Sequence, residues 1–509
     1  MSTKTSPSNH HRFRRLWNAS LLTTTAVAFI GADVTADTIT VCLDGTCDHT
    51  DIQSAIDAAV NGDLISISGE TYLLDATLDT LGKRLTLRGA GDEKTGASNT
   101  ILDGQGLHRV LQCINGEGPD TVFEKLLIQN GLAKISYFDT IDGSEIVGGG
   151  VFNQMSDASF VQCTFKRNNA PFGYGGAFFN DRSESTFTDC AFIDNISEYD
   201  GGGGFDYFSQ VTFTNCTFMK NISVRDMGGG VVSNRSDDAF TNCTFERNVA
   251  RFGGGAHNFQ SNNTLISCTF TNNSTGKMGS GAGMYSFDSF TILSDSTFTE
   301  NFGNAGALDN YKGESVITNC VFTDNSGNLG GGMVNSECFT SISDCTFANN
   351  SVQQTGGGMY SNGFATLTNC TFTNNSAGIQ GGGMHSVAGS DSLINCTFAN
   401  NSAGTGGGMC SRDGSFPSLT NTTVCENIPN QITGSYSDED DNCISESCTT
   451  CVECPGDLGG DGDVGGADLT IVLNTWGCTG PSCLGDANGD EVVDGADLTV
   501  ILNAWGTCQ

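Results

Sequence analysis

Short runs of alternating apolar and polar residues recur along most of the chain, and one of them, C-T-F-x-x-N, returns every 24 to 28 residues. The Cys and the Phe of this run are separated by one Thr, so in a strand both side chains face the same side, which we expect to be the inside. A unit of this length without a helical period is too short for two helices and suits one coil of a parallel β-solenoid. The pattern therefore predicts an all-β fold with regular repeats over 148–430.

All eleven copies of the run keep the asparagine, even the two in which Ser296 and Thr422 replace the cysteine. Identical positions form ladders in stacked coils, so each asparagine can bond its own turn and the next asparagine amide. The predicted structural ladder consists of Asn168, Asn195, Asn221, Asn248, Asn273, Asn301, Asn325, Asn350, Asn375, Asn401 and Asn427.

Blocks of small residues, such as GGGV and GGGM, follow roughly ten residues after each asparagine and predict tight bends. Each block ends in an apolar residue, such as Met, that should face inward. By strand alternation, the residue that follows this apolar residue should face outward. This row contains Phe179, Asp206, Val232, His257, Tyr285, Asp309, Val334, Tyr360, His385 and Cys410. An exposed row of His, Tyr and Asp side chains can hold a sugar chain by stacking and hydrogen bonding.

Asp206, His257 and Asp309 are the weak catalytic candidates of this row. Asp206 and Asp309 are expected four coils apart, about 19 Å, whereas the paired carboxylates of glycosidases lie about 5 to 9.5 Å apart. His257 and Asp309 are expected two coils apart, about 10 Å, which excludes direct contact. The row therefore predicts variable surface positions better than a catalytic pair.

The segments before the regular repeats predict a cap and less regular coils over 37–130. Thr50 and Gln53 have capping-box spacing, and the apolar residues that follow share one helical face. This short helix and the next strand would close the apolar end of the solenoid. Residues 131–147 exceed the repeat length and are interpreted as an inserted loop.

The first 36 residues predict an export signal, because basic residues up to Arg15 precede an apolar run and a small-residue cleavage site. We therefore expect a signal peptide at 1–36 and a mature chain that is secreted or held at the cell surface. Later segments contain no apolar stretch long enough to span a bilayer.

The paired F-x-x-N and GGA/GGG-apolar motifs resemble the repeats of polymorphic outer-membrane proteins. The amphipathic cap followed by coils resembles the pectin-lyase-like group. Together these resemblances cover roughly 37–430. They imply a right-handed parallel β-helix with a secreted or cell-surface role, and the members of these groups include adhesins and polysaccharide-active enzymes.

Acidic residues outnumber basic ones by 57 to 22, which gives a formal net charge of −35. Nucleic acids and anionic lipid surfaces are poor partners for such a chain, because like charges repel and binding would release no counterions. Neutral or cationic ligands and metal cations suit it better.

Nine of the 22 cysteines lie on the repeat ladder and are expected to act as small apolar core residues. A linker predicted at 431–455 holds four more: Cys443, Cys448, Cys451 and Cys454. Their spacing would suit a zinc or iron–sulfur site, but in an exported chain it favours disulfides. Cys42 and Cys47 are expected to close a local loop.

Residues 456–509 contain two related segments, and the second predicts a calcium loop followed by a helix. Its oxygen donors fall at loop positions 1, 3, 5, 7, 9 and 12, as a hard cation requires. They are Asp486, Asn488, Asp490, the Val492 carbonyl, Asp494 and Asp497. The first segment keeps fewer donors, Asp457, Asp461, Asp463 and Asp468, and predicts a weaker second site.

Each loop leads into a helix with Leu and Trp at positions i, i+4 and i+7, which share one helical face. The two helices are therefore expected to pack against each other through these faces. The residues are Leu469, Leu473 and Trp476 in the first helix and Leu498, Leu502 and Trp505 in the second. The duplicated loop and helix resemble dockerin modules. That resemblance implies calcium-dependent folding and docking to a cohesin-like or surface protein partner.

Two classes of function follow. The first is a binding, adhesive or structural β-helix attached through its calcium module, and it is favoured by regular repeats without charged clusters. The second is a polysaccharide lyase or glycoside hydrolase, and it is favoured by the dockerin-like module that accompanies such enzymes.

Overall fold

The computed structural model describes residues 36–91, 99–136, 145–440, 442–448, 456–459, 463–480 and 483–507. Apart from Ala36, the predicted signal peptide lies outside these residues, as do Cys451, Cys454, Asp461 and residues 137–144 of the predicted loop. Among the described residues, no helix has the length and apolar character that a membrane crossing requires.

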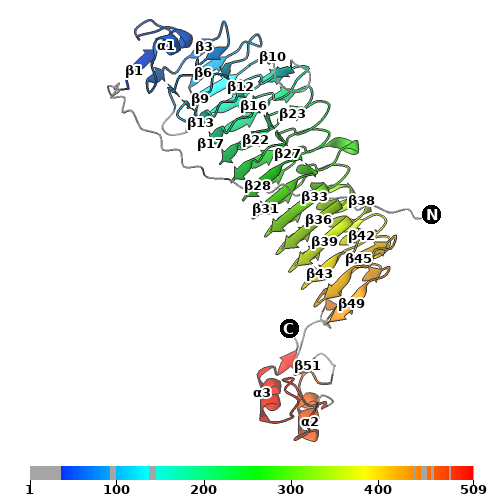
Figure 1. Ribbon diagram of the computed structural model, residues 1–509. Helices are drawn as coiled ribbons and strands as arrows, with labels where there is room; N and C mark the ends of the chain where they lie inside the picture. The colour runs from blue at the N-terminus through cyan, green and yellow to red at the C-terminus, as the bar shows by residue number, and fades with distance from the viewer. Residues whose placement is uncertain are drawn as a thin grey trace, which may run out of the picture. The chain divides into compact units, whose positions relative to one another are not determined.

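Parallel strands stack coil upon coil into a solenoid, as the successive arrows from β12 (Val151–Gln154) to β45 (Met409–Arg412) show (Figure 1). One face is a 27-stranded parallel sheet, which we call sheet A, and another is a 15-stranded parallel sheet, sheet B. Sheet B consists of β3 (Thr71–Leu73), β6 (Thr100–Asp103), β9 (Leu126–Gln129), β14 (Thr164–Lys166), β18 (Ala191–Ile193), β22 (Thr217–Met219), β26 (Thr244–Glu246), β29 (Thr269–Thr271), β32 (Thr297–Thr299), β34 (Val321–Thr323), β37 (Thr346–Ala348), β40 (Thr371–Thr373), β44 (Thr397–Ala399), β47 (Thr423–Cys425) and β50 (Cys443–Ser445).

A typical coil contains two strands of sheet A, one strand of sheet B and one short bridging strand. In one coil these are β16 (Phe178–Asp181), β17 (Thr186–Thr188), β18 and β19 (Ile196–Ser197). The next coil repeats them as β20 (Gly204–Tyr207), β21 (Thr212–Thr214), β22 and β23 (Ile222–Ser223), each paired in parallel with its predecessor. Because strands of two to four residues cannot turn alone, residues in the left-handed region separate them, for example Asp189 at φ 54°.

The core is a set of side-chain ladders, and its main ladder is the stacked phenylalanines of sheet B. From Phe165 to Phe398, successive ring centroids lie 4.5 to 5.0 Å apart, with interplanar angles of 2 to 16°. The cysteines of the repeat line the same interior and are buried, and their thiols donate to carbonyls of the preceding coil, as from Cys190 Sγ to Phe160 O at 3.4 Å. The inward orientation predicted for Cys and Phe is therefore confirmed.

The repeated asparagines form a buried ladder beside sheet B. Asn273 Nδ2 donates to Phe245 O at 2.8 Å and to Asn301 Oδ1 at 3.1 Å, while Asn273 Oδ1 accepts from the backbone N–H of Asn248 at 3.0 Å. Each amide thus satisfies backbone groups at a corner where the strand hydrogen bonds are interrupted. From Asn168 to Asn427, the ladder joins each coil to the next.

Both ends of the solenoid differ in detail from the prediction. The capping helix α1 spans Ile52–Ala58, but Asp51 caps it, because the Asp51 Oδ1 accepts from Ser54 N at 2.8 Å. The capping box predicted at Thr50 is therefore wrong by one position. Beyond the expected boundary at residue 430, β48 (Ile432–Thr433), β49 (Ser437–Asp440) and β50 continue the ladders of the preceding coil.

The predicted inserted loop contains an antiparallel pair at its two described ends. Strand β10 spans Lys134–Ser136 and pairs with β11, which spans Glu145–Val147. This pair departs from the parallel order of the coils.

The C-terminal module contains two helices, α2 (Gly466–Asn474) and α3 (Gly495–Asn503), and a short antiparallel pair, β51 (Asp463–Val464) with β52 (Gly506–Thr507). Its core contains Val464, Val472, Val493 and Ile501. The predicted packing of the two helices is wrong for four of its six residues. Leu473, Trp476, Leu502 and Trp505 are 50 to 57% exposed instead of buried between the helices. Helices of only nine residues bury a narrower stripe, centred one residue before the expected leucines.

Candidate functional site

The row predicted to face solvent is buried along most of its length. Phe179, Val232, His257, Asp309 and His385 are each at most 5% exposed. Alternation does turn the row away from the main core, but the glycine bends fold the preceding chain segment over it. In the first regular coils, the row belongs to a hydrophobic cluster separate from the main core. The cluster consists of Val147, Phe152, Phe179, Phe205 and Val232. The expectation of an exposed row is therefore wrong.

Asp206 belongs to a different row from the one predicted. Strand register pairs Phe205 with Phe179 and Asp206 with Asn180, because Gly204 takes the core position that Phe178 holds in the preceding coil. The extra glycine in this block displaced the alignment by one residue. Asp206 consequently points into the solenoid and is fully buried.

Inside the solenoid, Asp206 faces a second buried carboxyl group, Asp238. Asp206 Oδ1 accepts from Asn180 Nδ2 at 2.6 Å, and Asp238 Oδ1 accepts from Val211 N at 2.9 Å. The second oxygen of each carboxyl group has no hydrogen-bond partner among the described residues unless the two share a proton. Burial, followed by the neighbouring Asp238, raises the pKa of Asp206 well above its usual range, and burial raises the pKa of Asp238 to about 7. We interpret the two groups as a proton-sharing pair.

His257 and Asp309 lie on either side of Tyr285 in three consecutive coils. The His257 and Tyr285 ring centroids are 5.2 Å apart. Burial lowers the pKa of His257 to about 3 and raises the pKa of Asp309 to about 7, so His257 is neutral at neutral pH. A fully buried neutral imidazole is a poor proton carrier for an external substrate. The structure thus buries both catalytic candidates and keeps Tyr285 between them.

The sequence interpretation missed an exposed site on the outer surface of sheet A, which we call the aromatic pocket. It has a volume of about 300 Å³, and its lining includes Phe290, Glu314, Val316, Phe339 and Phe364. Three strands hold its centre: β33 (Leu308–Thr318), β36 (Met333–Ser343) and β39 (Met359–Thr368). Each of these long strands covers a stretch of chain that forms two separate short strands in other coils. The outer surface of sheet A is therefore continuous here.

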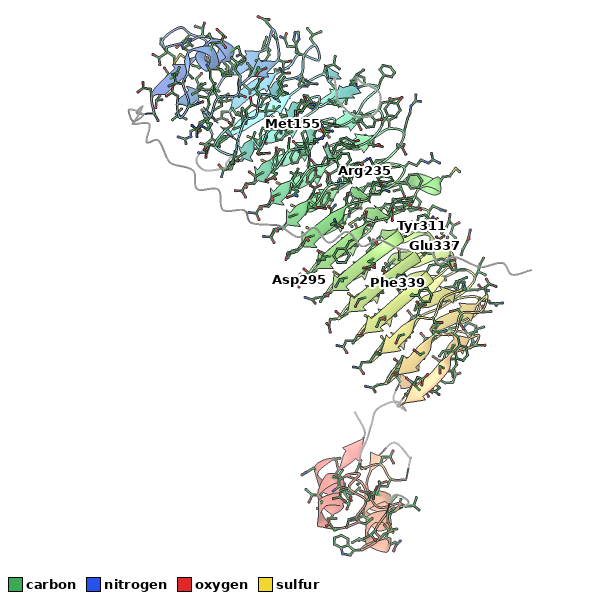
Figure 2. All side chains as sticks on the ribbon, in the orientation of Figure 1. Met155, Arg235, Asp295, Tyr311, Glu337 and Phe339 are labelled. Carbon is green, nitrogen blue, oxygen red and sulfur yellow. A yellow bond between two sulfur atoms is a disulfide. The ribbon has the colours of Figure 1, made fainter. Side chains whose placement is uncertain are left out.

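The aromatic side chains of the pocket are unusually exposed for their size. Phe339, labelled in Figure 2, is 62% exposed and Phe364 is 50% exposed. Their rings stack with centroids 5.2 Å apart and an interplanar angle of 9°. Strand register places Phe290, Glu314, Phe339 and Phe364 in one row across four coils. In the coil before it, Asn262 holds this position, so the recurrence of phenylalanine at one position of successive repeats was the signal available in the sequence.

A small polar cluster precedes the pocket on the same strands (Figure 2). Tyr311 Oη donates to Glu337 Oε1 at 3.4 Å, and Lys312 Nζ lies 3.8 Å from Glu337 Oε2 and 5.0 Å from the centre of the Tyr311 ring. The lining of the pocket itself contains one carboxylate, Glu314. Paired-carboxylate hydrolysis needs two, so this lining is better suited to binding than to that chemistry.

In the C-terminal module, the second loop folds around its own carboxylates. Asp486 Oδ1 accepts from Gly489 N at 2.8 Å, and Asp490 Oδ1 accepts from Val492 N at 2.9 Å. Asp497 is buried and accepts from Ala487 N and Asp494 N, both at 2.8 Å. Glu491, where a turn glycine is usual, adopts φ 67°.

The donor chemistry of this loop fits calcium, because all the predicted ligands are oxygens in one turn of twelve residues. Within the described residues, however, no three His, Cys, Asp or Glu side chains converge as metal ligands. In the first loop, Asp468 is buried and accepts from Gly459 N and Gly465 N at 2.8 Å, and Asp457 and Asp463 lie in described segments.

Disulfides account for the described members of the cysteine cluster. Cys448 bonds Cys425, and Cys443 is also in a disulfide. Cys42 bonds Cys47, as predicted, and Cys478 bonds Cys483. The interpretation of the cluster as disulfides is confirmed for Cys443 and Cys448.

The family model for a right-handed β-helix region matches residues 148–322 and 229–403, which together cover just over half of the 509-residue chain. No curated protein matches the chain.

Several solved structures are similar to this chain at low identity. Bacteriophage CBA120 tailspike protein 3 is 10% identical, with a TM-score of 0.37 over 77% of this chain, which spans 58% of the tailspike. The PL6 family alginate lyase AlyGC is 12% identical, with a TM-score of 0.27 over 80% of this chain and 72% of its own. The Family 28 exopolygalacturonase of Yersinia enterocolitica is 10% identical, with a TM-score of 0.16 over 81% of this chain and 78% of its own.

Proposed function

This chain belongs to the right-handed β-helix family, and from that premise we propose that it is a secreted or cell-surface protein that binds a neutral glycan in its aromatic pocket. In this proposal the repeats are of the polymorphic outer-membrane protein type, and a calcium-dependent dockerin-like module attaches the protein to a surface or cohesin-like partner.

The observation that carries the proposal is the exposed, stacked pair of Phe339 and Phe364. Leaving two large rings in water forgoes the favourable burial of apolar area, so such a pair is expected to be covered by a ligand. The apolar face of a sugar ring covers an aromatic ring, while sugar hydroxyls need acceptors. Glu314, in the same row, supplies such an acceptor, and the acidic surface favours a neutral glycan over an acidic one.

Replacing both Phe339 and Phe364 with Ala tests this proposal. We expect the dissociation constant for the bound glycan to rise by about tenfold or more, equivalent to about 1.4 kcal/mol, because the stacking surface is lost. Titration calorimetry against a panel of neutral polysaccharides measures this constant. Phe302→Ala is the matched control, since Phe302 is 45% exposed but does not line the pocket.

An unchanged affinity in the double variant, or an equal loss in the control, would contradict the proposal. A polysaccharide lyase or glycoside hydrolase is the second candidate, supported by the acid and base groups of Tyr311, Lys312 and Glu337 beside the pocket. Release of reducing ends that depends on Glu314 and Glu337 would favour the enzyme over the binding protein.

Calcium binding by the second loop is part of the proposal. Bound calcium would neutralise the carboxylates of Asp486, Asp490 and Asp494 and fix the loop before α3. We expect Asp490→Ala to weaken calcium binding by at least about tenfold, because it removes one charged ligand. Calorimetric titration of the calcium-free protein measures the change.

Glu491→Gln is the control for this variant, since it removes a charge from the same loop without removing a proposed ligand. Equal weakening in both variants would show that net loop charge, rather than ligation, determines the affinity.

A further inference from the structure

A second cavity lies at the corner where three successive strands of sheet B end: β6, β9 and β14, of which the first two are labelled in Figure 1. It has a volume of about 460 Å³, and its lining includes Asp103, Gln105, Asn130, Leu132, Arg167 and Asn169. We call this cavity the polar pocket. It shares no lining residue with the aromatic pocket.

The carboxylate of Asp103 is held in place in the first of these coils. Asp103 is only 9% exposed. Its Oδ1 accepts from Gln105 N at 2.8 Å, and its Oδ2 accepts from Gln129 Nε2 at 2.9 Å and from Asn130 Nδ2 at 2.8 Å. A carboxylate has about four acceptor positions, so Oδ1 can accept one more hydrogen bond. All these donors are neutral, and no Lys, Arg or His of the described residues forms an ion pair with Asp103.

The guanidinium of Arg167 lines the same pocket from two coils further along the solenoid. The backbones of two such coils are about 10 Å apart. Arg167 is exposed, and within the described part of the chain its side chain forms no ion pair and donates no hydrogen bond. The polar pocket therefore contains one anionic and one cationic group that do not pair with each other.

The walls between these two groups are fixed by hydrogen bonds. Gln105 Nε2 donates to Leu74 O at 2.9 Å, and Gly106 N donates to Asn130 O at 2.7 Å. Because the walls are already ordered, a ligand loses little affinity to ordering the protein.

Ligands with a single charge and apolar ligands fit the polar pocket poorly. A calcium or magnesium ion needs about six oxygen ligands, whereas the lining contains one carboxylate, and the guanidinium of Arg167 repels cations. An anion would meet Asp103 and a chain with a net charge of −35. An apolar ligand would find one large apolar side chain, Leu132. A ligand that carries both a cationic and an anionic group meets none of these objections.

We propose that the polar pocket binds a small zwitterion of the α-amino acid type. The ammonium group of the ligand donates to Asp103 Oδ1, and its carboxylate accepts from the guanidinium of Arg167. Both contacts are hydrogen bonds between charged groups, which are stronger than those between neutral groups. The ligand has no net charge, so the acidic chain does not repel it. This site is independent of the proposed glycan site, because the two pockets have no residue in common.

The test is calorimetric titration of the full chain with glycine, the smallest α-amino acid. We expect one glycine to bind per chain with a dissociation constant on the order of 1 mM, because both contacts border water. Methylamine and acetate each carry one of the two charged groups of glycine. Each should bind at least about fivefold more weakly than glycine, because one charge-assisted contact is lost.

Two variants assign the two contacts. Arg167→Gln alters an exposed side chain and should weaken glycine binding at least about fivefold while leaving methylamine binding unchanged. Asp103→Asn keeps the shape of the side chain and should weaken glycine binding by a similar factor without weakening acetate binding. Arg247→Gln is the matched control, since Arg247 has the same left-handed backbone, φ 53° against 54° for Arg167, but does not line the pocket.

Three results would overturn the proposal. The first is the absence of saturable glycine binding to the wild type, and the second is an equal loss of binding in Arg247→Gln and Arg167→Gln. The third is binding of glucuronate as tight as that of glycine, which would assign the pocket to an acidic sugar. If Asp103→Asn changes the circular dichroism spectrum, the exposed Arg167→Gln variant and the comparison of glycine with methylamine and acetate still decide the outcome.

Discussion

Replacing Asp206 with Asn should flatten the pH dependence of stability between pH 4 and 7. The pKa of Asp206 is raised well above its usual range and the pKa of Asp238 is raised to about 7, so the folded state binds protons that the unfolded state has released. Stability from this pair is fully present below the unfolded pKa and is lost as the pH rises through the folded values. The loss should be on the order of 2 to 4 kcal/mol in the wild type.

Melting temperatures measured across this pH range give the slope directly. Asp206→Asn keeps the side-chain shape but removes one charge, so Asp238 no longer has to share a proton with it. A smaller slope should remain, because Asp238 stays buried in the variant and burial also raises the pKa values of Asp200 and Asp309 to about 7. Asp237→Asn is the control, since Asp237 is exposed beside Asp238, and an equal flattening there would contradict the shared-proton interpretation.

Replacing Phe270 with Ala should lower the free energy of unfolding by about 3 to 5 kcal/mol, because it opens a cavity in a fully packed ladder. Phe270 is fully buried, and its ring centroid lies 4.6 Å from that of Phe245 and 4.5 Å from that of Phe298. Chemical denaturation measures the change. Phe416→Ala, at a position that is 51% exposed, should change it by less than about 0.5 kcal/mol.

The damage from Phe270→Ala should also be local. Each coil contacts only its neighbours, so solenoid stability is nearly a sum over adjacent coils. Hydrogen exchange should accelerate most in β26, β29 and β32 and change little in β14. Uniform acceleration along the whole solenoid would contradict this nearest-neighbour view.

The repeating part of the fold could be predicted because its determinants are local and repeated. The Cys and Phe of each run face inward by simple alternation, and the asparagines stand where the chain turns. Eleven copies average out irregular residues. The single capping error, Asp51 instead of Thr50, arose because both residues can cap a helix and only backbone geometry decides between them.

The position of the candidate site could not be predicted in the same way. Gly204 shifts the register of Asp206 by one residue, and only the pairing with the preceding coil reveals it. The burial of His257 and Asp309 depends on how far the glycine bends fold the chain back, which alternation does not encode. The aromatic pocket depends on three long strands that replace pairs of short ones, and its phenylalanines come from separate coils.

The matched contacts between successive coils have an evolutionary consequence. The asparagine and phenylalanine of one coil meet their counterparts in the next through the same contacts throughout the regular repeats. A gene that gains or loses one repeat unit therefore yields a protein whose new junction is already matched. The distance between any two surface features of the solenoid can change in heritable steps of about 4.8 Å, without a compensating mutation in the core.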